Sequence, residues 1–323
     1  MDAPWVSLAK IEEARERISG IVVRTPLVPA SRFEDDGVYL KMECLQPTGS
    51  FKVRGAWNRV STSTDEERRR GFVTVSAGNH GQALAWAAKR VGSSCTVYVP
   101  EDAVERKVES IKSMGATTIR RPHQEIMESM SDDRMTKLGM TFVHPFADPK
   151  VVAGQGTIGL EILEDKPRVR TVVVPVGGGG LVNGIAQAIK AKRPEVEFYG
   201  VQAEGAAPLP MSLRSGVAED FGDTKTIADG IGATRVYDYM LPLFKKNLKG
   251  AFTVSDEELK LTMGRLANES HVVVEPAGAA ALAGALKHRK ELEEPIVCVV
   301  SGGNVDPKLL REVLEAGERK GTL

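Results

Sequence analysis

Short apolar runs alternate with helix-like stretches along most of the chain, and this alternation restricts the fold more than any other feature. Between residues 72 and 121, the runs FVTVS, CTVYVP and ATTIRR are separated by segments with helical spacing. The rhythm returns from 171 to 202 and ends with IVCVV at 296–300. Nearly continuous apolar strands suit sheets that helices cover on both faces. The sequence therefore predicts an α/β fold with parallel sheets.

The length of the chain favours two closely packed domains. At 323 residues it exceeds the roughly 150 residues of an average domain, and no Pro/Ser-rich linker or repeat divides it. The first βαβαβ unit predicts a small domain at 71–147. Residues 1–70 and 148–323 would form a larger domain around it. The cleft between two such domains is a favoured place for a ligand.

The charge balance and the cysteine content limit the kinds of partner and the cellular compartment that we expect. Lys plus Arg and Asp plus Glu are 43 each, so nothing favours a nucleic acid or an anionic membrane. No run of about 18 apolar residues occurs, and the first residues carry acids where a signal peptide needs bases. The three cysteines are too scattered for a disulfide framework or a CxxC metal site. We expect a cytoplasmic protein with a small-molecule ligand.

Four consecutive glycines follow the predicted strand at 171–176 and precede a predicted helix. Gly177, Gly178, Gly179 and Gly180 leave room for an anion, and the free N–H groups at the helix start point toward it. A phosphate site is therefore predicted. Two alternatives are a tight turn without a ligand and a dinucleotide site that uses Glu204. The dinucleotide pattern GxGxxG fails because Val182 stands at its third glycine position.

Lys52 lies at the start of another predicted helix, in PTGSFKVRGAWNRV. A lysine is usually a surface residue. Here the apolar Phe51 beside it and a partly desolvated pocket would disfavour the charged amine, and Arg54 would act in the same direction. A neutral amine can form an imine with an aldehyde. Lys52 is therefore the candidate nucleophile.

Two further loops follow predicted strands. SAGNHG brings Ser76, Gly78, Asn79 and His80 to a helix start, where a carboxylate could bind, although N-capping alone also explains Ser76 or Asn79. We do not assign His80 as a general base. SGGN brings Ser301, whose hydroxyl can pair with a heterocyclic nitrogen without carrying charge. Glu275 precedes Pro276 in a helix-initiation pattern.

The segments SFKVRGA, SAGNHGQA, GGGGL and SGGN, in this order, resemble the fold-type II pyridoxal-phosphate enzymes. Within that group the chain looks most like the threonine/serine dehydratases and serine racemase, above all a short, catabolic-type threonine dehydratase. The resemblance runs from RTPL at 24–27 to Asp306. It implies two parallel-sheet domains with pyridoxal 5'-phosphate in the cleft between them.

The resemblance also implies a role for each site residue. Lys52 would form the imine with the cofactor and later remove the substrate α-proton. The implied cofactor contacts are Gly177, Gly178, Gly179, Gly180 and Leu181 at the phosphate, Asn79 at the ring hydroxyl, Phe51 on one ring face, Ser301 at the pyridine nitrogen, and Gly230 and Glu275 near the ring. The implied substrate-carboxylate loop consists of Ser76, Ala77, Gly78, Asn79 and His80.

The implied reaction is β-elimination. A serine at the pyridine nitrogen makes the cofactor a weak electron sink, which disfavours a long-lived carbanion. Threonine would give 2-oxobutanoate and serine would give pyruvate, each with ammonia. A racemase or a 3-hydroxyaspartate dehydratase of the same fold is the alternative. From another class, a non-catalytic nucleotide-binding or sensor protein is also considered.

Departures from the racemase-like pattern favour the dehydratase. Ala77 stands where such racemases carry a second serine, and Phe146 stands where they carry Asn. Gln202 replaces an expected Glu at their cation site, and Pro208 falls where a second acid would lie. We therefore expect no divalent metal, whereas a monovalent ion stays possible. The chain stops soon after Asp306, so we expect no regulatory domain and no isoleucine feedback, and a homodimer or homotetramer is usual in the family.

Overall fold

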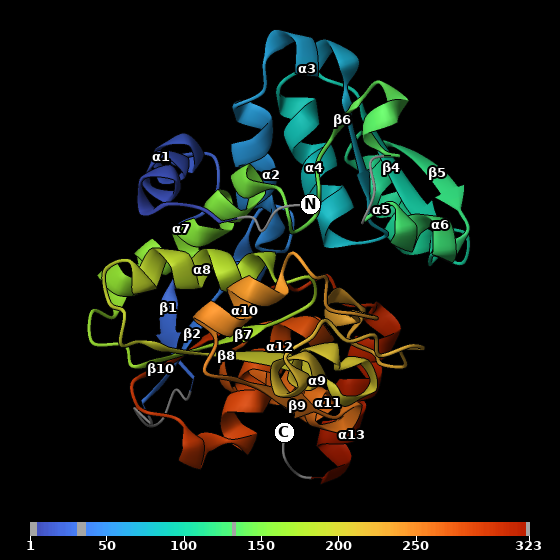
Figure 1. Cartoon of the computed structure of the whole chain (residues 1–323). Helices are drawn as coiled ribbons and strands as arrows, with labels where there is room; N and C mark the ends of the chain where they lie inside the picture. The colour runs from blue at the N-terminus through green and yellow to red at the C-terminus, as the bar shows by residue number, and fades with distance from the viewer. Residues whose placement is uncertain (1–4, 31–36, 131–133, 321–323) are drawn as a thin grey trace.

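The fold is α/β, as predicted, and is built on two mainly parallel sheets that lie side by side (Figure 1). The computed structural model describes residues 5–30, 37–130 and 134–320. The predicted strands at 72–76, 95–100, 171–176 and 296–300 are all confirmed within a residue. Nothing in the described ranges is a helix long and apolar enough to cross a membrane.

The larger sheet has six strands in the order β1-β2-β10-β7-β8-β9. They are β1 (Leu27–Pro29), β2 (Val38–Lys41), β10 (Ile296–Val299), β7 (Thr171–Pro175), β8 (Glu197–Ala203) and β9 (Gly250–Val254). Neighbouring strands run parallel except β1 and β2, which are antiparallel. Because successive side chains alternate between faces, Val173 packs in one core cluster and Val172 in another. Both faces of this sheet are therefore buried.

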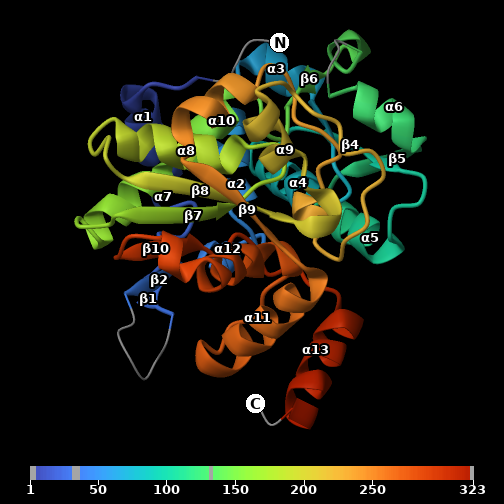
Figure 2. The same ribbon diagram turned by 60° about the horizontal axis from the view of Figure 1, so that its bottom comes forward.

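Helices cover both faces of the larger sheet (Figure 2). On one face lie α1 (Leu8–Ile18), α7 (Pro149–Asp165), α8 (Gly180–Lys190) and α10 (Leu241–Asn247). On the other face lie α12 (Pro276–Lys287) and α11 (Asp256–Glu269), with α13 (Pro307–Lys320) packed on α11. Helix α9 (Pro208–Ser215) packs against β9. This covering explains why the strands are continuously apolar.

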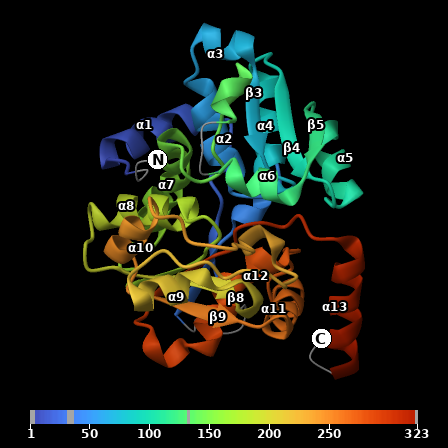
Figure 3. The same ribbon diagram turned by 45° about the vertical axis from the view of Figure 1, so that its right-hand side comes forward.

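The smaller sheet has four parallel strands in the order β5-β4-β3-β6. They are β5 (Thr117–Arg121), β4 (Cys95–Pro100), β3 (Phe72–Val75) and β6 (Thr141–Phe142). Helices α3 (Asp65–Arg70), α4 (Asn79–Arg90), α5 (Glu105–Ser113) and α6 (His123–Glu128) pack around it, as Figure 3 shows. All four strands fall inside residues 71–147, whose boundaries as a separate domain stay a prediction.

Helix α2 (Lys52–Ser61) lies between the two sheets, because it packs against α4 on one side and α7 on the other. The contact with α7 is close. A Cβ atom at Gly55 would lie 2.6 Å from the carbonyl oxygen of Val151, and one at Gly154 would lie 2.6 Å from Gly55 Cα. Glycines at these two positions therefore let the backbones touch, which fixes the position of the helix that begins at Lys52.

Short 3-10 turns complete the path of the chain. They are η1 (Glu43–Leu45), η2 (Thr136–Leu138), η3 (Glu204–Ala206), η4 (Asp229–Ile231) and η5 (Arg289–Glu291). One of them, η4, contributes residues to the candidate site described next.

Candidate active site

A cavity of about 500 Å³ lies where the loops after β3, β7 and β10 meet. It brings together every residue that the sequence singled out for the site. These are Phe51, Lys52, Ser76, Ala77, Gly78, Asn79, His80, Gly177, Gly178, Gly179, Gly180, Leu181, Gly230, Glu275 and Ser301. The loops that follow these strands thus line one cavity at the carboxyl ends of the strands, and the roles of their residues stay a prediction.

Lys52 is the first residue of α2, as the sequence predicted, and its side chain borders the cavity. Its Nζ donates to the carbonyl oxygen of Pro145 at 2.9 Å. Burial lowers the pKa of Lys52 to about 8. A substantial fraction of this amine is therefore neutral near pH 8, and a neutral amine can attack an aldehyde or accept a proton.

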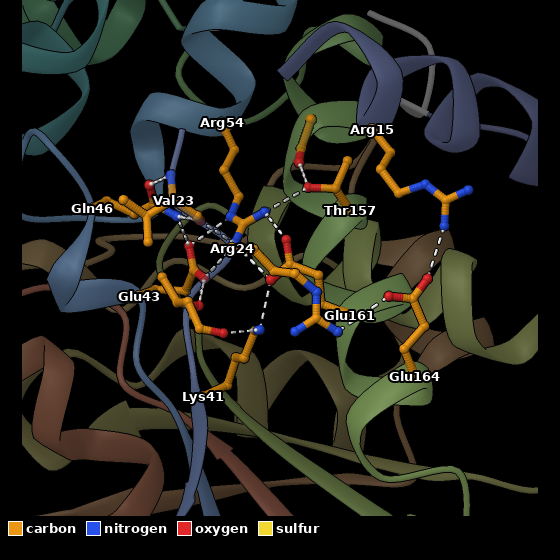
Figure 4. Close-up of polar contacts among 12 residues, drawn as sticks. Arg15, Val23, Arg24, Lys41, Glu43, Gln46, Arg54, Thr157, Glu161 and Glu164 are labelled. Atoms are coloured by element: carbon orange, nitrogen blue, oxygen red, sulfur yellow. Dashed lines mark hydrogen bonds and ion pairs between the residues drawn. The ribbon is translucent and has the colours of Figure 1, made fainter. Parts of the chain in front are cut away.

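Arg54 belongs to a buried ion-pair network on another side of α2 (Figure 4). Its Nε donates to Glu43 at 2.8 Å, and its Nη1 donates to Glu161 at 2.6 Å. Lys41 adds a 2.6 Å ion pair to Glu161. The four side chains are at most 8% exposed. Two cations thus face two carboxylates, and the network is balanced in charge.

The balanced charges of this network correct one expectation about the pKa of Lys52. Arg54 was expected to lower the pKa of the Lys52 amine, but burial alone accounts for the shift. Residues two positions apart are separated by about 200° around the helix axis, so Lys52 and Arg54 point to nearly opposite sides of α2. In addition, the charge of Arg54 is compensated by Glu43 and Glu161. The arginine therefore anchors the helix and does not tune the lysine.

The four glycines form the turn between β7 and α8, and their backbone N–H groups are available. Within the described part of the chain, nothing accepts a hydrogen bond from the backbone N–H of any residue from Gly177 to Leu181. Gly179 has a φ of +94°, which favours glycine. A helix start with several free N–H groups beside a cavity is suited to binding a phosphate.

Side chains also require this turn to consist of glycine. A Cβ atom at Gly178 would lie 2.2 Å from the Phe146 ring, and one at Gly179 would lie 2.3 Å from Phe244. The turn is therefore pressed between two aromatic rings. A Cβ atom at Gly180 would also lie 2.8 Å from the Phe146 carbonyl oxygen, so packing accounts for three of the four glycines without a ligand, but it leaves the free N–H groups unexplained.

The loop between β3 and α4 contributes small groups, and the first turn of α4 contributes one imidazole ring. The N–H of Gly78 donates to the Ser76 hydroxyl at 3.2 Å. His80 is buried, and its Nε2 faces the carbonyl oxygen of Val143 at 3.3 Å. Burial and the nearby Lys52 hold the pKa of His80 well below its ordinary value. An imidazole whose pKa is this low binds a proton weakly, so His80 would be a weak general base.

Ser301 links the last strand to the start of α2. Its backbone oxygen accepts a hydrogen bond from the N–H of Phe51 at 3.0 Å, and its hydroxyl donates to the Ala277 carbonyl at 3.3 Å. The residue is only 3% exposed and borders the cavity. It therefore presents an uncharged hydroxyl near Lys52.

Glu275 is the N-cap of α12, as the helix-initiation pattern predicted, and it is buried. Burial raises the pKa of Glu275 to about 7, although a hydrogen bond from Asn79 acts in the opposite direction. Gly230 lies nearby, since a Cβ on it would approach Ala277. A carboxyl that titrates near neutrality inside a cavity is a typical feature of a functional site.

Several cavity residues were not identified from the sequence. Lys107 of α5 and Asp229 of η4 form an ion pair that joins the two halves of the cavity. Pro145, Tyr237 and Asn304 also line it. In the sequence, neither Lys107 nor Tyr237 belongs to a distinctive motif, so no sequence signal pointed to them. Asn304 stood inside the SGGN segment and could have been recognised there.

The alternative sites have less support. Glu204 is half exposed and pairs with Lys287, outside the cavity. A larger hollow of about 670 Å³ lies beside β9, but it contains none of the predicted residues, and Lys249 and Lys287 on its rim are paired with glutamates. Among the described residues, no group of three or more His, Cys, Asp or Glu side chains could hold a metal ion.

Pyridoxal phosphate fits the groups in the main cavity. It carries an aldehyde, for which the cavity offers a half-buried amine of lowered pKa, and a phosphate, for which it offers the free N–H groups of the glycine turn. Together with the two parallel-sheet units, these groups define the class of fold-type II pyridoxal-phosphate enzymes.

The chain belongs to the pyridoxal-phosphate dependent enzyme family, whose sequence pattern matches residues 18–302. It is 40% identical to an L-threonine ammonia-lyase of Thermotoga maritima over 318 residues, which cover 97% of this chain and 79% of the relative. It is 38% identical to a catabolic L-threonine dehydratase, TdcB, of Staphylococcus aureus, over 97% of this chain and 93% of the relative.

A solved structure gives the same picture. Maize serine racemase matches 98% of this chain and 99% of its own with a TM-score of 0.88 and 33% sequence identity. The cofactor of the family is pyridoxal phosphate, and the expectation of that cofactor is confirmed.

Proposed function

We propose that the protein is an ammonia-lyase that converts L-threonine, L-serine or both to 2-oxobutanoate or pyruvate, with release of ammonia. The observation that carries the proposal is the half-buried Lys52 amine beside the glycine turn, which has no ion-pair partner among the residues that the structure describes. Relatives named threonine ammonia-lyase and threonine dehydratase support the substrate class. They also favour an enzyme over a non-catalytic nucleotide-binding or sensor protein.

The proposed site residues hold the cofactor, the substrate or, in the case of Asn79, both. When bound, pyridoxal phosphate withdraws electrons from the α-carbon of an amino acid and makes its α-hydrogen acidic. The residues proposed to hold it are Lys52, Phe51, Asn79, Gly177, Gly178, Gly179, Gly180, Leu181, Gly230, Glu275 and Ser301. The residues proposed to hold the substrate carboxylate are Ser76, Ala77, Gly78, Asn79 and His80.

Lys52 is the proposed acceptor of the α-proton. Its Nζ is oriented by the Pro145 carbonyl, and its lowered pKa of about 8 permits it both to take and to return a proton near neutral pH. Ser301 offers a hydroxyl in place of a carboxylate, so it adds no negative charge to the cavity. Both properties suit a reaction in which the β-hydroxyl leaves promptly after the proton is removed.

The experiment that tests this function is keto-acid release from a panel of L- and D-β-hydroxy amino acids that includes threonine, serine and 3-hydroxyaspartate. We expect the highest kcat/KM with L-threonine or L-serine. A preference for 3-hydroxyaspartate would favour the alternative dehydratase hypothesis. No keto acid from any of them would contradict the proposal.

A racemase is the alternative that the similarity to maize serine racemase favours. Racemisation needs an acid on each face of the substrate, and Ala77 supplies none in the carboxylate loop. We therefore expect L-serine to give pyruvate and little D-serine, and Ala77→Ser to raise the D-serine fraction. Chiral chromatography of the products measures both. An unchanged fraction would contradict the role given to this loop.

Gln202 supports a reaction without a divalent metal. Its Nε2 donates to the Val176 carbonyl at 3.1 Å, and its Oε1 accepts from the Leu209 N–H at 2.8 Å. Both ends of the amide are thus occupied by backbone groups, and the side chain brings no negative charge for a divalent cation. We expect a chelator to leave turnover largely intact. A strict calcium or magnesium requirement would overturn this part.

We further propose a cytoplasmic homodimer or homotetramer. All three cysteines are buried thiols, which suits a reducing compartment. Light scattering of the purified protein measures the number of subunits, and a monomer would contradict the proposed assembly.

A further inference from the structure

Four segments that carry the cavity are joined by one chain of polar contacts. Asn304 Nδ2 donates to the backbone oxygen of Thr48 at 2.9 Å and to Oδ1 of Asn79 at 2.7 Å. Asn79 Nδ2 then donates to Oε1 of Glu275 at 2.6 Å. The chain runs from the loop before α2, through the loop after β10 and the start of α4, to the start of α12. It therefore couples the segments that surround Lys52.

The direction of every hydrogen bond in this chain follows from its first member. A backbone carbonyl such as that of Thr48 only accepts, so the end of the Asn304 side chain that faces it has to be the NH₂ group. The same NH₂ group faces Asn79, which therefore has to present its oxygen. The NH₂ group of Asn79 is then left to donate to Glu275. Through Asn304, the Thr48 carbonyl thus determines that the NH₂ group of Asn79, and not its oxygen, faces the Glu275 carboxyl.

This direction matters because Glu275 is buried and ionisable. A Cβ on Gly302 would lie 2.1 Å from Glu275 Oε1, so the carboxyl is closely packed. The charged groups that act on it are Asp229, which raises its pKa, and Lys107, which lowers it. An amide N–H is the partner that a carboxylate needs, whereas an amide oxygen in its place would require a protonated acid.

We propose that Asn304 is a positioning residue that fixes the orientation of the Asn79 amide, so that Asn79 donates to Glu275 while it faces the cavity. The proposal deepens the proposed function, because it rests on the cofactor role given to Asn79. Neither the resemblance nor the relatives assign Asn304. Its effect on the site is exerted through Asn79 and not through contact with the reacting atoms.

The test reverses the direction of the hydrogen bonds that join Asn304, Asn79 and Glu275. In Asn304→Asp the side chain no longer donates to Asn79, so the Asn79 amide turns and presents its oxygen to Glu275. This arrangement is satisfied only when Glu275 carries a proton. We expect the dissociation constant of pyridoxal phosphate, measured by absorbance titration, to rise about tenfold to a hundredfold at pH 8, the range expected for a lost hydrogen bond to a charged group. At pH 6 the rise should be smaller, because this pH is below the Glu275 pKa of about 7.

A second substitution should rescue the first. When Asn304→Asp is combined with Glu275→Gln, the amide introduced at position 275 donates to the reversed Asn79 oxygen without needing a proton. The cost of Asn304→Asp, measured against Glu275→Gln alone, should then fall to less than about threefold and lose its pH dependence. An equal cost in both backgrounds, or no cost in either, would overturn the proposal.

Asn247→Asp is the matched control. Asn247 is also a buried amide that donates to another asparagine, Asn183, at 2.9 Å, but it lies outside this chain. We expect Glu275→Gln to give no rescue there. The same cycle is measured on the cofactor-free protein by the urea midpoint of unfolding. If the protein bound no pyridoxal phosphate, the proposed function would fail, while rescue or its absence in the urea series would still decide the role of Asn304.

Discussion

Two of the cationic residues of helix α2, Lys52 and Arg54, are in opposite environments. Lys52 lies at the cavity, donates to a neutral carbonyl, and has a pKa that burial lowers to about 8. Arg54 lies in the network of Figure 4 with two carboxylates as partners, and its pKa is raised. The carboxyl of Glu43 in that network has a lowered pKa. The Lys52 amine can thus lose its charge and react, whereas the Arg54 guanidinium stays charged.

The difference shows what separates a reactive lysine from a structural cation. Both groups lose solvation on burial, and only a counter-charge offsets that loss. Without one, the Lys52 amine is pushed toward its neutral form. With two, the Arg54 guanidinium stays charged and ties α2 to η1 and α7. The position of the reactive amine therefore depends on the neighbour that does not react.

The largest effect expected is the loss of turnover in Lys52→Ala. Removing the proposed proton acceptor should lower kcat for keto-acid release by about 10³-fold to 10⁴-fold, as expected for loss of a general base that also holds the cofactor. The visible absorbance of the bound cofactor should also change. Lys52→Arg is the control, because it keeps a cation but not a titratable amine. Turnover within tenfold of the original in either variant would break the comparison.

The next effect is the destabilisation caused by Arg54→Met. The substitution leaves Glu43 and Glu161 without their guanidinium partner, and breaking a buried ion pair from one side costs about 3–5 kcal/mol. Urea unfolding at pH 7 measures the loss. Arg54→Lys should cost less, although a lysine cannot reproduce the forked contacts to both acids.

The pH dependence of this loss provides its control. The pKa of Glu43 is lowered in the folded protein, so its pairing stabilises the fold above the ordinary carboxyl pKa near 4.5, and this stabilisation is lost as the pH falls further. Without Arg54, the buried Glu43 becomes easier to protonate. The difference between variant and original should therefore shrink between pH 7 and pH 4. A constant difference would show that packing, and not charge, was lost.

The third effect is a gain in folding stability, in contrast to the loss expected for Arg54→Met. Because the folded pKa of Lys52, about 8, is below the ordinary lysine value of 10.5, the unfolded chain binds more protons between these pH values. Stability therefore rises with pH across this window, and the penalty of the buried amine is complete below pH 8. We expect Lys52→Met to stabilise the cofactor-free protein by about 1–2 kcal/mol at pH 7. The gain should vanish near pH 10.5, which urea unfolding at both pH values measures.

Most of the site could be predicted from the sequence because its members follow strands. Ser76, Gly177 and Ser301 each come directly after an apolar run, and parallel strands bring such positions to one edge. Lys52 could be predicted because a serine and a glycine precede it at a helix start. Each of these signals is local and weak by itself, and the prediction rests on the four segments taken together in their order along the chain.

The rest depends on contacts between distant residues. The ion pair of Lys107 with Asp229 spans 122 positions, and the bond from Asn304 to Thr48 spans 256. The pairing of Arg54 with Glu161, 107 positions away, is also why the expectation for Lys52 was wrong in this detail. Helix spacing and composition carry no information about such partners. Strands β1, β2, β6 and β9 were missed as well, because the first three have at most four residues and β9 is only partly apolar.

The smallest effect expected is that of Arg15→Ala, at the edge of the network in Figure 4. Arg15 donates to Glu164 at 3.0 Å, a distance close to those within the network, but the two side chains are 39% and 49% exposed. Water already solvates both charges, so their pairing should contribute no more than about 0.5 kcal/mol to the free energy of unfolding. Urea unfolding at low and high salt measures it. A loss comparable to that of Arg54→Met would show that the geometry of the pair, and not its burial, decides the energy, and the contrast drawn between Lys52 and Arg54 would then lose its physical basis.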